Sequence, residues 1–294
     1  MKRRTFIKNS ALMAVSVSAF GAISWNGKNF VGDTPTTTDI LGPFYRPGAP
    51  LRSNIIPPGS AGIPLNLRGT IFKEDGTTAL ESAFIEIWQC DENEHYDNVS
   101  DDYLFRGAVK TGSDGKYDFK TIVPVPYKAD QNNEASWRPA HIHVRVSSPM
   151  QQDLITQIYF KGDQYNDKDS SSSSPQAVNR ILQISKNSSN ENVVTFNIVM
   201  SKNFPLDASV YKKITGLYEM DKDIFEFVQN DDLLFMKRNG QLIASFTYIG
   251  NNTFESGLGT QKVIFELLAK GGAKASITNG TKTYTGEKFL KYNE

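Results

Sequence analysis

The sequence WRPAHIHVRV, residues 137–146, contains two of the three histidines in this 294-residue chain. Its β-branched residues predict a strand. Residues two apart in a strand point to the same face of a sheet, so His141 and His143 would present their imidazoles side by side. Such a pair suits two ligands of one metal ion, although alone it leaves open an ordinary pair of polar residues on a solvated face. The stretch predicts a sheet with a candidate site on one face.

Strand-like segments continue on both sides of this stretch. Residues 85–89, IEIWQ, alternate apolar and polar positions as a half-buried strand does. The Ser-Asp-Gly at 113–115 predicts a hairpin turn, while LITQIYFKGD (154–163) and ENVVTFNIVM (191–200) predict further strands. A Ser-rich loop and one short helix are expected within 167–185. Several short strands with regularly spaced turns predict an all-β fold, a β-sandwich domain with few helices over residues 25–204.

The C-terminal part of the chain predicts a second domain. Residues 201–209, SKNFPLDAS, are expected to form a linker. Beyond it, strand-length segments are separated by Asn-Asp, Asn-Gly, Asn-Asn and Gly-Gly turns. We expect a small antiparallel β-domain over residues 210–294, for which an up-and-down barrel is one arrangement that fits. This region contains no histidine and no cysteine, so nothing in it predicts chemistry.

The N-terminus predicts an export signal. Residues 1–24 combine a basic start, a short apolar run and small residues near the end. Arg3 and Arg4, followed by Thr-Phe-Ile-Lys, are typical of a twin-arginine signal, with an ordinary secretory signal as the alternative. The apolar run is too short and too interrupted for a membrane anchor. We therefore expect a periplasmic or extracellular protein, with no membrane span in its mature form.

Charge and cysteine content narrow the classes of function. Lys plus Arg and Asp plus Glu both number 32, so the net charge is zero and indicates neither a nucleic-acid groove nor a polybasic membrane patch. The single cysteine, Cys90, excludes an intramolecular disulfide and Cys-rich metal sites. It is expected to be a packed residue rather than a reactive thiol. Any metal here must use His, Tyr, Asp or Glu.

Two tyrosines near the histidine pair are candidate ligands. Tyr127 precedes His141 by fourteen residues, and Tyr96 lies in the loop after IEIWQ. A phenolate is a hard, anionic oxygen ligand, and a trivalent cation lowers the pKa of a phenol far below its free value of about 10. Two phenolates and two neutral imidazoles suit Fe(III), but a tyrosine is more often a core or surface residue. Spacing alone therefore leaves the assignment open.

Five segments together resemble one enzyme family. They are LGPFYRPGAP (41–50), WQCDENEHY (88–96), FRGAVKTGSDGKYDFKTIVPVPY (105–127), WRPAHIHVRV (137–146) and LITQIYFKGD (154–163). Their order and spacing resemble those of the intradiol ring-cleavage dioxygenases, which include catechol 1,2-dioxygenase and protocatechuate 3,4-dioxygenase. The resemblance covers roughly residues 35–200. It implies that a catechol-type ring is cleaved between its two hydroxyl-bearing carbons with O₂, giving a muconate-type diacid.

The same resemblance implies a non-haem Fe(III) held by two tyrosinates and two histidines. Matched by motif, the tyrosinates fall on Tyr96 and Tyr127 and the imidazoles on His141 and His143. Tyr127 corresponds to the tyrosinate that leaves the iron when substrate binds in this family. Tyr103 is a rival for the role given to Tyr96, which has the better spacing.

The resemblance also places Arg138 and Gln157 beside the substrate ring. The planar, permanently charged guanidinium of Arg138 suits negative charge that develops during the reaction. The plainer alternatives are a surface charge for Arg138 and a hydrogen-bonding role in the sheet for Gln157. Trp88 and Trp137 are expected to be packing residues rather than substrate contacts.

Some features depart from the family pattern. The usual Gly-Pro-Tyr reads Val-Pro-Tyr at 125–127, and the loop between Tyr96 and Arg106 is short, which puts the substrate range in doubt. The long helical dimerisation region of catechol 1,2-dioxygenases is missing, so the chain is closer to the compact protocatechuate type. A homo-oligomer stays one of the arrangements that the sequence leaves open.

Two alternatives compete with the dioxygenase interpretation. One is a non-catalytic exported β-sandwich that binds an aromatic or carbohydrate ligand. The other is a cupin-like metal site built on His141 and His143 alone. Cupins usually supply a glutamate a few residues after the pair and a further histidine downstream, and no histidine follows His143.

Overall fold

The computed structural model describes residues 16–18, 21–25, 30–32, 35–204, 206–269 and 272–289. Much of the expected export signal, residues 1–24, lies outside these ranges. Near the N-terminus β1 (Ser16–Ser18), β2 (Gly21–Trp25) and β3 (Phe30–Gly32) form a small antiparallel sheet. Within the described ranges, no helix has the length and apolar character that a membrane crossing requires.

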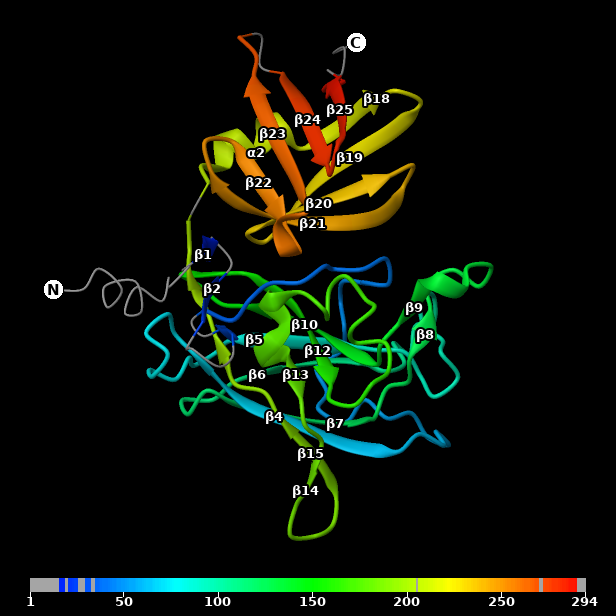
Figure 1. Ribbon diagram of the computed structural model, residues 1–294. Coiled ribbons are helices and arrows are strands. Elements are labelled where there is room, and N and C mark those ends of the chain that lie inside the picture. The colour runs from blue at the N-terminus through cyan, green and yellow to red at the C-terminus, as the bar shows by residue number, and fades with distance from the viewer. Residues whose placement is uncertain are drawn as a thin grey trace, which may run out of the picture.

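The first large sheet carries the histidine pair on its middle strand. Its order is β13-β12-β10-β5-β6 (Figure 1). The strands are β5 (Phe84–Trp88), β6 (Arg106–Lys110), β10 (His141–Ser147), β12 (Leu154–Phe160) and β13 (Ile181–Leu182). All neighbouring strands are antiparallel except β12 and β13, which are parallel. The central strand β10 is paired on both sides, with β12 and with β5.

A second sheet packs against the first. It is built around β4 (Pro64–Phe72), which pairs with β7 (Lys116–Ile122), β15 (Asn192–Thr195) and β16 (Ile198–Val199), while β14 (Ser185–Lys186) pairs with β15. Two short ribbons join β8 (Tyr127–Lys128) to β9 (Trp137–Arg138), and β11 (Gln151–Gln152) to β17 (Ser201–Lys202). A 3₁₀ turn, η1 (Glu134–Ser136), precedes β9.

The inner faces of the two sheets form one apolar core. Alternate residues of each strand point inward because the side-chain period of a strand is two. The core includes Ile87 of β5, Val144 of β10, Leu67 of β4 and Phe119 of β7, all of them buried. The predicted all-β sandwich with few helices is confirmed.

The other face of the first sheet is also buried, and it is polar. His141, His143 and Arg145 share this face of β10, and each is at most 6% exposed. In the register of the sheet, His143 lies between Trp88 of β5 and Gln157 of β12. Polar side chains on a sheet face that is shielded from water require hydrogen-bond partners and other parts of the chain that cover the face. The candidate site lies on this face.

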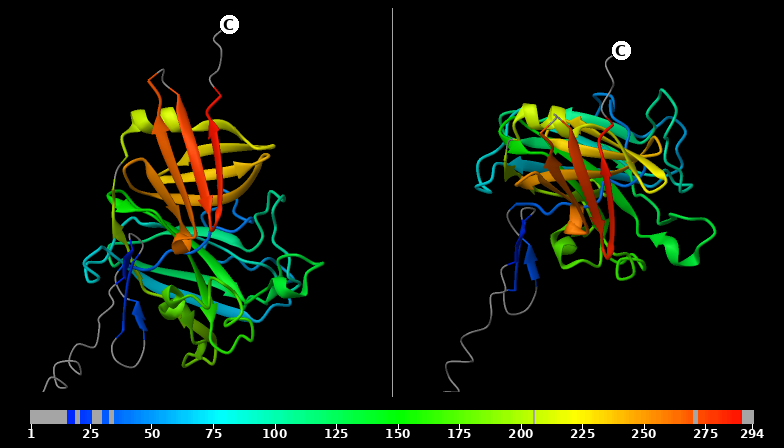
Figure 2. Two further views of the ribbon diagram at one scale, coloured as in Figure 1. Left: turned by 45° about the horizontal axis from the view of Figure 1, so that its top comes forward. Right: turned by 90° about the horizontal axis from the view of Figure 1, so that it is seen from above.

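The C-terminal domain is an eight-stranded up-and-down barrel. Each strand pairs antiparallel with the next along the chain, and an additional bridge between Tyr218 and Lys288 closes the ring. Figure 2 shows the barrel, in yellow to red, stacked over the sandwich. Its strands are β18 (Gly216–Met220), β19 (Asp223–Asn230), β20 (Leu233–Arg238), β21 (Gln241–Gly250), β22 (Thr253–Ser256), β23 (Gln261–Leu267), β24 (Ala273–Asn279) and β25 (Lys282–Glu287).

Side chains fill the interior of the barrel. Phe227, Phe246, Phe254 and Phe265 are at most 2% exposed and pack with small residues such as Ala275. An eight-stranded barrel is just wide enough for side chains to fill it. The lumen is therefore a packed core, in agreement with the absence of chemistry-bearing residues from this part of the sequence.

The expected helix of the sandwich is a short 3₁₀ helix, and an α-helix lies further along the chain. Residues 175–180 form η2 (Pro175–Arg180), which begins after a Ser174 cap. Only six residues separate the serine run from β13, and 3₁₀ turns are used for such short pieces. The α-helix α2 (Ala208–Ile214) begins inside the expected linker, where the Asp207 side chain accepts a hydrogen bond from the Ser209 amide.

Candidate metal centre

Four aromatic rings meet over the polar face of the first sheet. The ring centroids of His141 and His143 lie 4.9 Å apart, and those of His143 and Tyr96 lie 6.0 Å apart. Tyr96 is 5.4 Å from Tyr127, and Tyr127 is 5.5 Å from His141, which closes the cycle. The structure thus brings together the four side chains that the sequence pointed to as ligands.

Several different segments supply and support these rings. Both histidines stand on β10, Tyr127 starts β8, and Tyr96 comes from the loop between β5 and β6. The ring of Trp88 stacks on His143 at 4.8 Å with an angle of 7° between the planes. Phe44 stacks on Tyr96 at 4.3 Å. Rigid aromatic neighbours therefore fix the orientation of one imidazole and one phenol.

The histidine nitrogens are arranged as ligands rather than as ordinary hydrogen-bonding groups. The Nδ1 of His141 lies 2.6 Å from the Pro139 carbonyl oxygen, to which it donates, so its Nε2 is left unprotonated and lies 3.3 Å from the Tyr96 hydroxyl. Neither nitrogen of the buried His143 has a hydrogen-bond partner among the described residues. Buried polar atoms are normally paired, so an orphaned imidazole indicates a missing ligand.

Gly42 allows the backbone to pass directly against His143. Its φ is +75°, a conformation that favours glycine, and a Cβ added there would lie 3.0 Å from Cε1 of the imidazole. A side chain at this position would therefore displace the ring. The LGPFY segment contributes to the site by close approach at Gly42 and by the stacked ring of Phe44.

Burial keeps all four candidate ligands neutral in the protein alone. It lowers the pKa of His141 to about 3, and Arg138 adds to the effect. Burial likewise holds the pKa of His143 well below its ordinary value. It raises the pKa of Tyr96 well above the ordinary value, with a further contribution from Tyr127. For Tyr127 burial raises the pKa against the opposing charge of Arg138.

This donor set fits a ferric ion. Neutral imidazoles are the form that binds metals, and a trivalent cation would offset the cost of ionising the buried phenols. In the described part of the chain, no group of three or more His, Cys, Asp or Glu side chains could hold a metal ion. A metal at His141 and His143 therefore depends on the two phenols, a set that suits hard Fe(III).

Arg138 lies beside the rings and is held in place by an ion pair. It faces Tyr127 across the β8–β9 ribbon, and its Nε donates to Asp169 at 2.9 Å. Its Nη2 donates to Gln157 Oε1 at 3.1 Å. Burial acts to lower the pKa of Arg138, but Tyr159 and Asp169 raise it overall. The guanidinium is therefore a fixed positive charge at the edge of the site.

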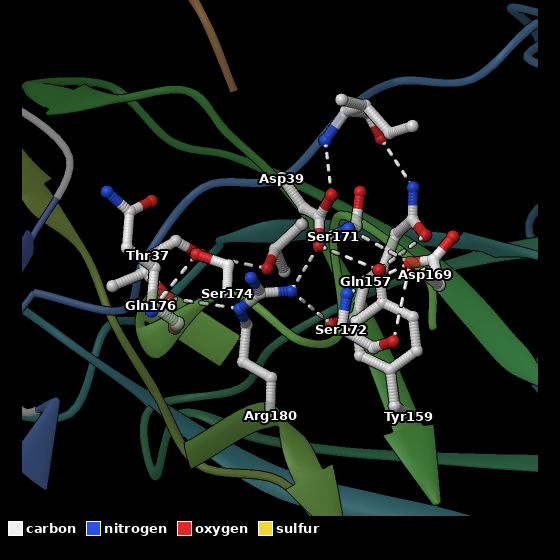
Figure 3. A network of polar contacts seen from close by, with 12 residues as sticks. Thr37, Asp39, Gln157, Tyr159, Asp169, Ser171, Ser172, Ser174, Gln176 and Arg180 are labelled. Atoms are coloured by element: carbon white, nitrogen blue, oxygen red, sulfur yellow. Dashed lines mark hydrogen bonds and ion pairs between the residues drawn. The ribbon is translucent and has the colours of Figure 1, made fainter. Parts of the chain in front are cut away.

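Buried polar contacts continue from Arg138 through Gln157 and Tyr159 to Asp39. Figure 3 shows the part of this network that includes Asp169 and Arg180. Asp169 accepts hydrogen bonds from the amides of Ser171 and Ser172 at 3.0 and 2.9 Å. Burial acts to raise the pKa of Asp169, but Arg138 and these amides hold it below the ordinary value. Gln157 donates to the Ile40 carbonyl at 2.7 Å. The Gln157 side chain thus links the segment around Ile40 to Arg138, which it helps to orient.

The far end of the network predicts a large effect on stability. Asp39 and Arg180 form an ion pair in which both side chains are at most 1% exposed. We expect Asp39→Ala to lower the free energy of unfolding by about 3–5 kcal/mol, because it leaves a buried guanidinium without its partner. Glu134→Ala, which removes an 86% exposed partner of Lys128, should have a much smaller effect, because solvent screens an exposed ion pair.

Urea unfolding followed by tryptophan fluorescence measures both changes, because the barrel contains no tryptophan and two of the three tryptophans, Trp88 and Trp137, lie in the sandwich. Equal losses of stability in the Asp39 and Glu134 variants would contradict the prediction.

The structure separates the two tyrosines that the sequence left as rivals. Tyr103 lies under the Arg46 guanidinium, whose central carbon is 4.2 Å from the centroid of the tyrosine ring. The Tyr103 hydroxyl donates to the Pro47 carbonyl at 3.3 Å. It is Tyr96 that joins the ring cluster. Sequence reasoning missed Asp169, which sits in the serine-rich segment without a recognisable motif. The expectation for Trp137 as a packing residue agrees with its stack on Tyr165 at 5.0 Å.

Comparisons with known proteins agree with the architecture. A family model described as Dioxygenase matches residues 40–202, more than half of the chain. Chlorocatechol 1,2-dioxygenase of Rhodococcus opacus is 33% identical over 189 residues, which cover 57% of this chain and 73% of the relative. Hydroxyquinol 1,2-dioxygenase of Nocardioides simplex is 31% identical over 183 residues, 58% of this chain and 60% of the relative.

A third relative and one solved structure show the same limits of coverage. Catechol 1,2-dioxygenase 2 of Acinetobacter lwoffii is 35% identical over 150 residues, 46% of this chain and 54% of the relative. The structure of 3-chlorocatechol 1,2-dioxygenase from Rhodococcus opacus 1CP is 27% identical, with a TM-score of 0.51 over 58% of this chain and 74% of that chain. The chain thus spans between about half and three quarters of these relatives.

The β-sandwich gathers two imidazoles and two phenols on its polar face, and the dioxygenase family model covers this part of the chain. The chain belongs to the intradiol ring-cleavage dioxygenase family, a family of oxidoreductases.

Proposed function

We propose that this chain uses non-haem Fe(III) and O₂ to cleave a catechol-type ring between its hydroxyl-bearing carbons, giving a muconate-type diacid. Tyr96, Tyr127, His141 and His143 would hold the iron. The observation that carries the proposal is the closed cycle of four rings around a buried, orphaned His143. The relatives support the substrate class, because their names give catechol, chlorocatechol and hydroxyquinol as what they act on.

Tyr127 is suited to take a proton from the substrate. When bound, ferric iron supplies a Lewis acid that lowers the pKa of phenols and makes a chelated catechol reactive toward O₂. A catechol loses two protons when it binds as a dianion, and the Oη of an ionised Tyr127 is a base already in place for one of them. Tyr127 sits at the start of a two-residue ribbon, whereas Tyr96 is fixed by the stack on Phe44. This difference favours Tyr127 as the phenol that moves.

Arg138 is suited to stabilise negative charge on the substrate ring. Its guanidinium is oriented by Asp169 and Gln157 before any substrate arrives. Charge stabilisation by a group that is already fixed costs no reorganisation during the reaction. The dry, aromatic walls around it strengthen the interaction, because water does not screen the charge.

The purified full-length protein, supplied with ferric iron, tests the proposal directly. We expect a burgundy colour from phenolate-to-iron charge transfer, and oxygen uptake with catechol, protocatechuate, hydroxyquinol or a larger lignin-like catechol. The diacid product should contain both atoms of ¹⁸O₂. Removal of the iron by a chelator should abolish the colour and the uptake together. A colourless, iron-free protein that takes up no oxygen with any of these catechols would overturn the proposal.

The variant Tyr127→Phe distinguishes this site from one that uses histidines alone. We expect it to bind iron, because three ligands are left, but to lose part of the visible absorption and to shift the rest. Activity should fall by about 10²–10⁴-fold, the usual range for loss of a positioned acid–base group. An unchanged visible spectrum would point to a His-only site. Tyr103→Phe, at the tyrosine outside the ring cluster, serves as the control and should change neither property.

We infer further that the protein is exported. The support is the pattern of residues 1–24, with Arg3 and Arg4 before a short apolar run. Fractionation of cells that express the full chain tests this inference, and recovery of the protein in the cytoplasm alone would contradict it.

A further inference from the structure

The C-terminal barrel covers the sheet face that carries the metal site. In Figure 1 the strands β20 and β21 lie on the side of the barrel that faces the sandwich. Leu233 and Phe235 of β20 join a buried cluster with Tyr45, Trp88 and other residues of the sandwich. We call this set the domain-contact cluster. Its buried members are Leu41, Tyr45, Trp88, Ile155, Leu233 and Phe235.

A continuous series of ring contacts leads from the barrel to His143. The ring of Phe235 meets Tyr45 edge to face with centroids 5.6 Å apart. Tyr45 meets Trp88 in the same manner at 5.0 Å, and Trp88 stacks on His143. Phe235 is 5% exposed and Trp88 is 1% exposed, so little free space is left along the series. Close-packed interiors transmit a change of position to their neighbours.

Polar contacts run parallel to the ring contacts. Arg145, two residues after His143 on the same face of β10, donates to the Tyr45 hydroxyl at 2.8 Å. It also donates to Asp153 of the sandwich at 2.9 Å and to Asp231 of the barrel at 2.7 Å. The Tyr45 hydroxyl in turn donates to Glu86 at 3.2 Å. The barrel therefore supplies one partner of a buried charge on the same strand as the candidate ligands.

A second contact joins the backbones of the barrel and of the sandwich. The backbone of Gly257, in the turn η3 (Gly257–Gly259), lies against the backbone of Asp39. A Cβ added at Gly257 would lie 2.0 Å from the Asp39 carbonyl oxygen, so this approach is possible only for glycine. Contacts at β20 and at η3 together restrict both tilting and sliding of the barrel.

We propose that Phe235 of the barrel is a positioning residue for the metal centre. Phe235 acts through Tyr45 and Trp88 to hold the imidazole of His143. The barrel is then a structural part of the catalytic site and not a separately tethered binding module. This inference rests on the proposed function, which places a ferric ion at the site. Groups that orient a metal ligand from outside typically change metal affinity by about 10–100-fold when removed.

Phe235→Ala tests the proposal against a matched variant, Phe225→Ala. Both remove a buried phenyl ring from the barrel, but Phe225 packs in the barrel interior and lies outside the domain-contact cluster. The readouts are the ferric dissociation constant, the position of the visible charge-transfer band and the tryptophan fluorescence of the iron-free protein. We expect Phe235→Ala to bind iron about 10–100-fold more weakly with a shifted band, while Phe225→Ala stays within about 3-fold of the wild type.

Gly257→Ala provides a second variant that leaves both apolar cores intact. The added methyl group should displace the barrel from Asp39, so we expect weaker iron binding and altered tryptophan emission in the same direction as for Phe235→Ala. Wild-type iron affinity and band position in both Phe235→Ala and Gly257→Ala would overturn the proposal. Equal losses in Phe235→Ala and Phe225→Ala would also overturn it, because they would reflect a generally weakened barrel.

The iron-free measurement separates this inference from the proposed function. If the wild-type protein binds no ferric iron, the proposed function fails. A fluorescence change in Phe235→Ala and Gly257→Ala, without one in Phe225→Ala, would still support the coupling of the barrel to Trp88 and His143. The same emission in all four proteins would overturn that coupling.

Discussion

Replacement of His143 by alanine is expected to remove the iron and the activity together. His143 is fully buried, and neither of its nitrogens is engaged by another described residue. Loss of a group that only orients a ligand costs about 10–100-fold in metal affinity, so loss of a ligand itself should cost about 10³-fold or more. The visible band should disappear from the purified protein, and oxygen uptake with catechols should fall to the uncatalysed background.

The third histidine of the chain provides the control for this experiment. His95 lies in the same loop as Tyr96, but its side chain is 81% exposed. His95→Ala should retain iron, colour and turnover within about 2-fold, since surface substitutions rarely have large effects. Equal iron content in His143→Ala and the wild type, measured by metal analysis, would show that the metal is held elsewhere.

The variant Arg138→Ala is expected to separate iron binding from turnover. Arg138 is oriented by Asp169 and Gln157, and it lies beside the phenol of Tyr127 without being a candidate ligand. Iron and the visible band should therefore be retained. The kcat should fall by about 10²–10³-fold, as it does when one group that stabilises developing charge is removed. Steady-state oxygen uptake with the best catechol of the panel measures kcat and KM separately.

Two further variants define what the guanidinium contributes. Arg138→Lys keeps the charge but loses the planar fork that Asp169 holds, so it should recover only part of the kcat. Arg68→Ala, at an exposed position on β4 of the other sheet, should behave as the wild type. A raised KM with unchanged kcat would argue that Arg138 only binds the substrate, and loss of iron in Arg138→Ala would argue that it supports the fold of the site instead of the reaction.

The placement of a barrel over the catalytic face gives a physical reason for its presence in the chain. Glu86 and Arg145 are buried although they stand on the outer face of a sheet, and Asp153, which lies just before β12, is buried beside Arg145. Burial raises the pKa of both Glu86 and Asp153 to about 7 against the opposing charge of Arg145. Such groups tolerate burial only when they are paired, and Asp231 of the barrel supplies one of the partners of Arg145.

Local pattern determined much of the fold. The period-two alternation of IEIWQ and the spacing of His141 and His143 follow from the geometry of a single strand, which needs no knowledge of distant residues. Turn pairs such as Asn-Gly at 239–240 likewise act over a few residues, and this pair lies between β20 and β21 as expected. The serine-rich segment was harder to predict, because the choice between an α-helix and a 3₁₀ turn depends on its anchoring through Arg180 to Asp39.

The sequence by itself determined that two imidazoles share one face of a strand. It also determined that tyrosines, in the motif order of the dioxygenase family, lie within reach of these imidazoles. Only the tertiary structure decided that Tyr96 and not Tyr103 joins them, that Asp169 orients Arg138, and that Phe235 of a second domain closes over Tyr45 and Trp88. The first facts arise from backbone periodicity between near neighbours. The others depend on contacts between residues from about 30 to almost 200 positions apart, and these are set by the packing of sheets and domains as a whole.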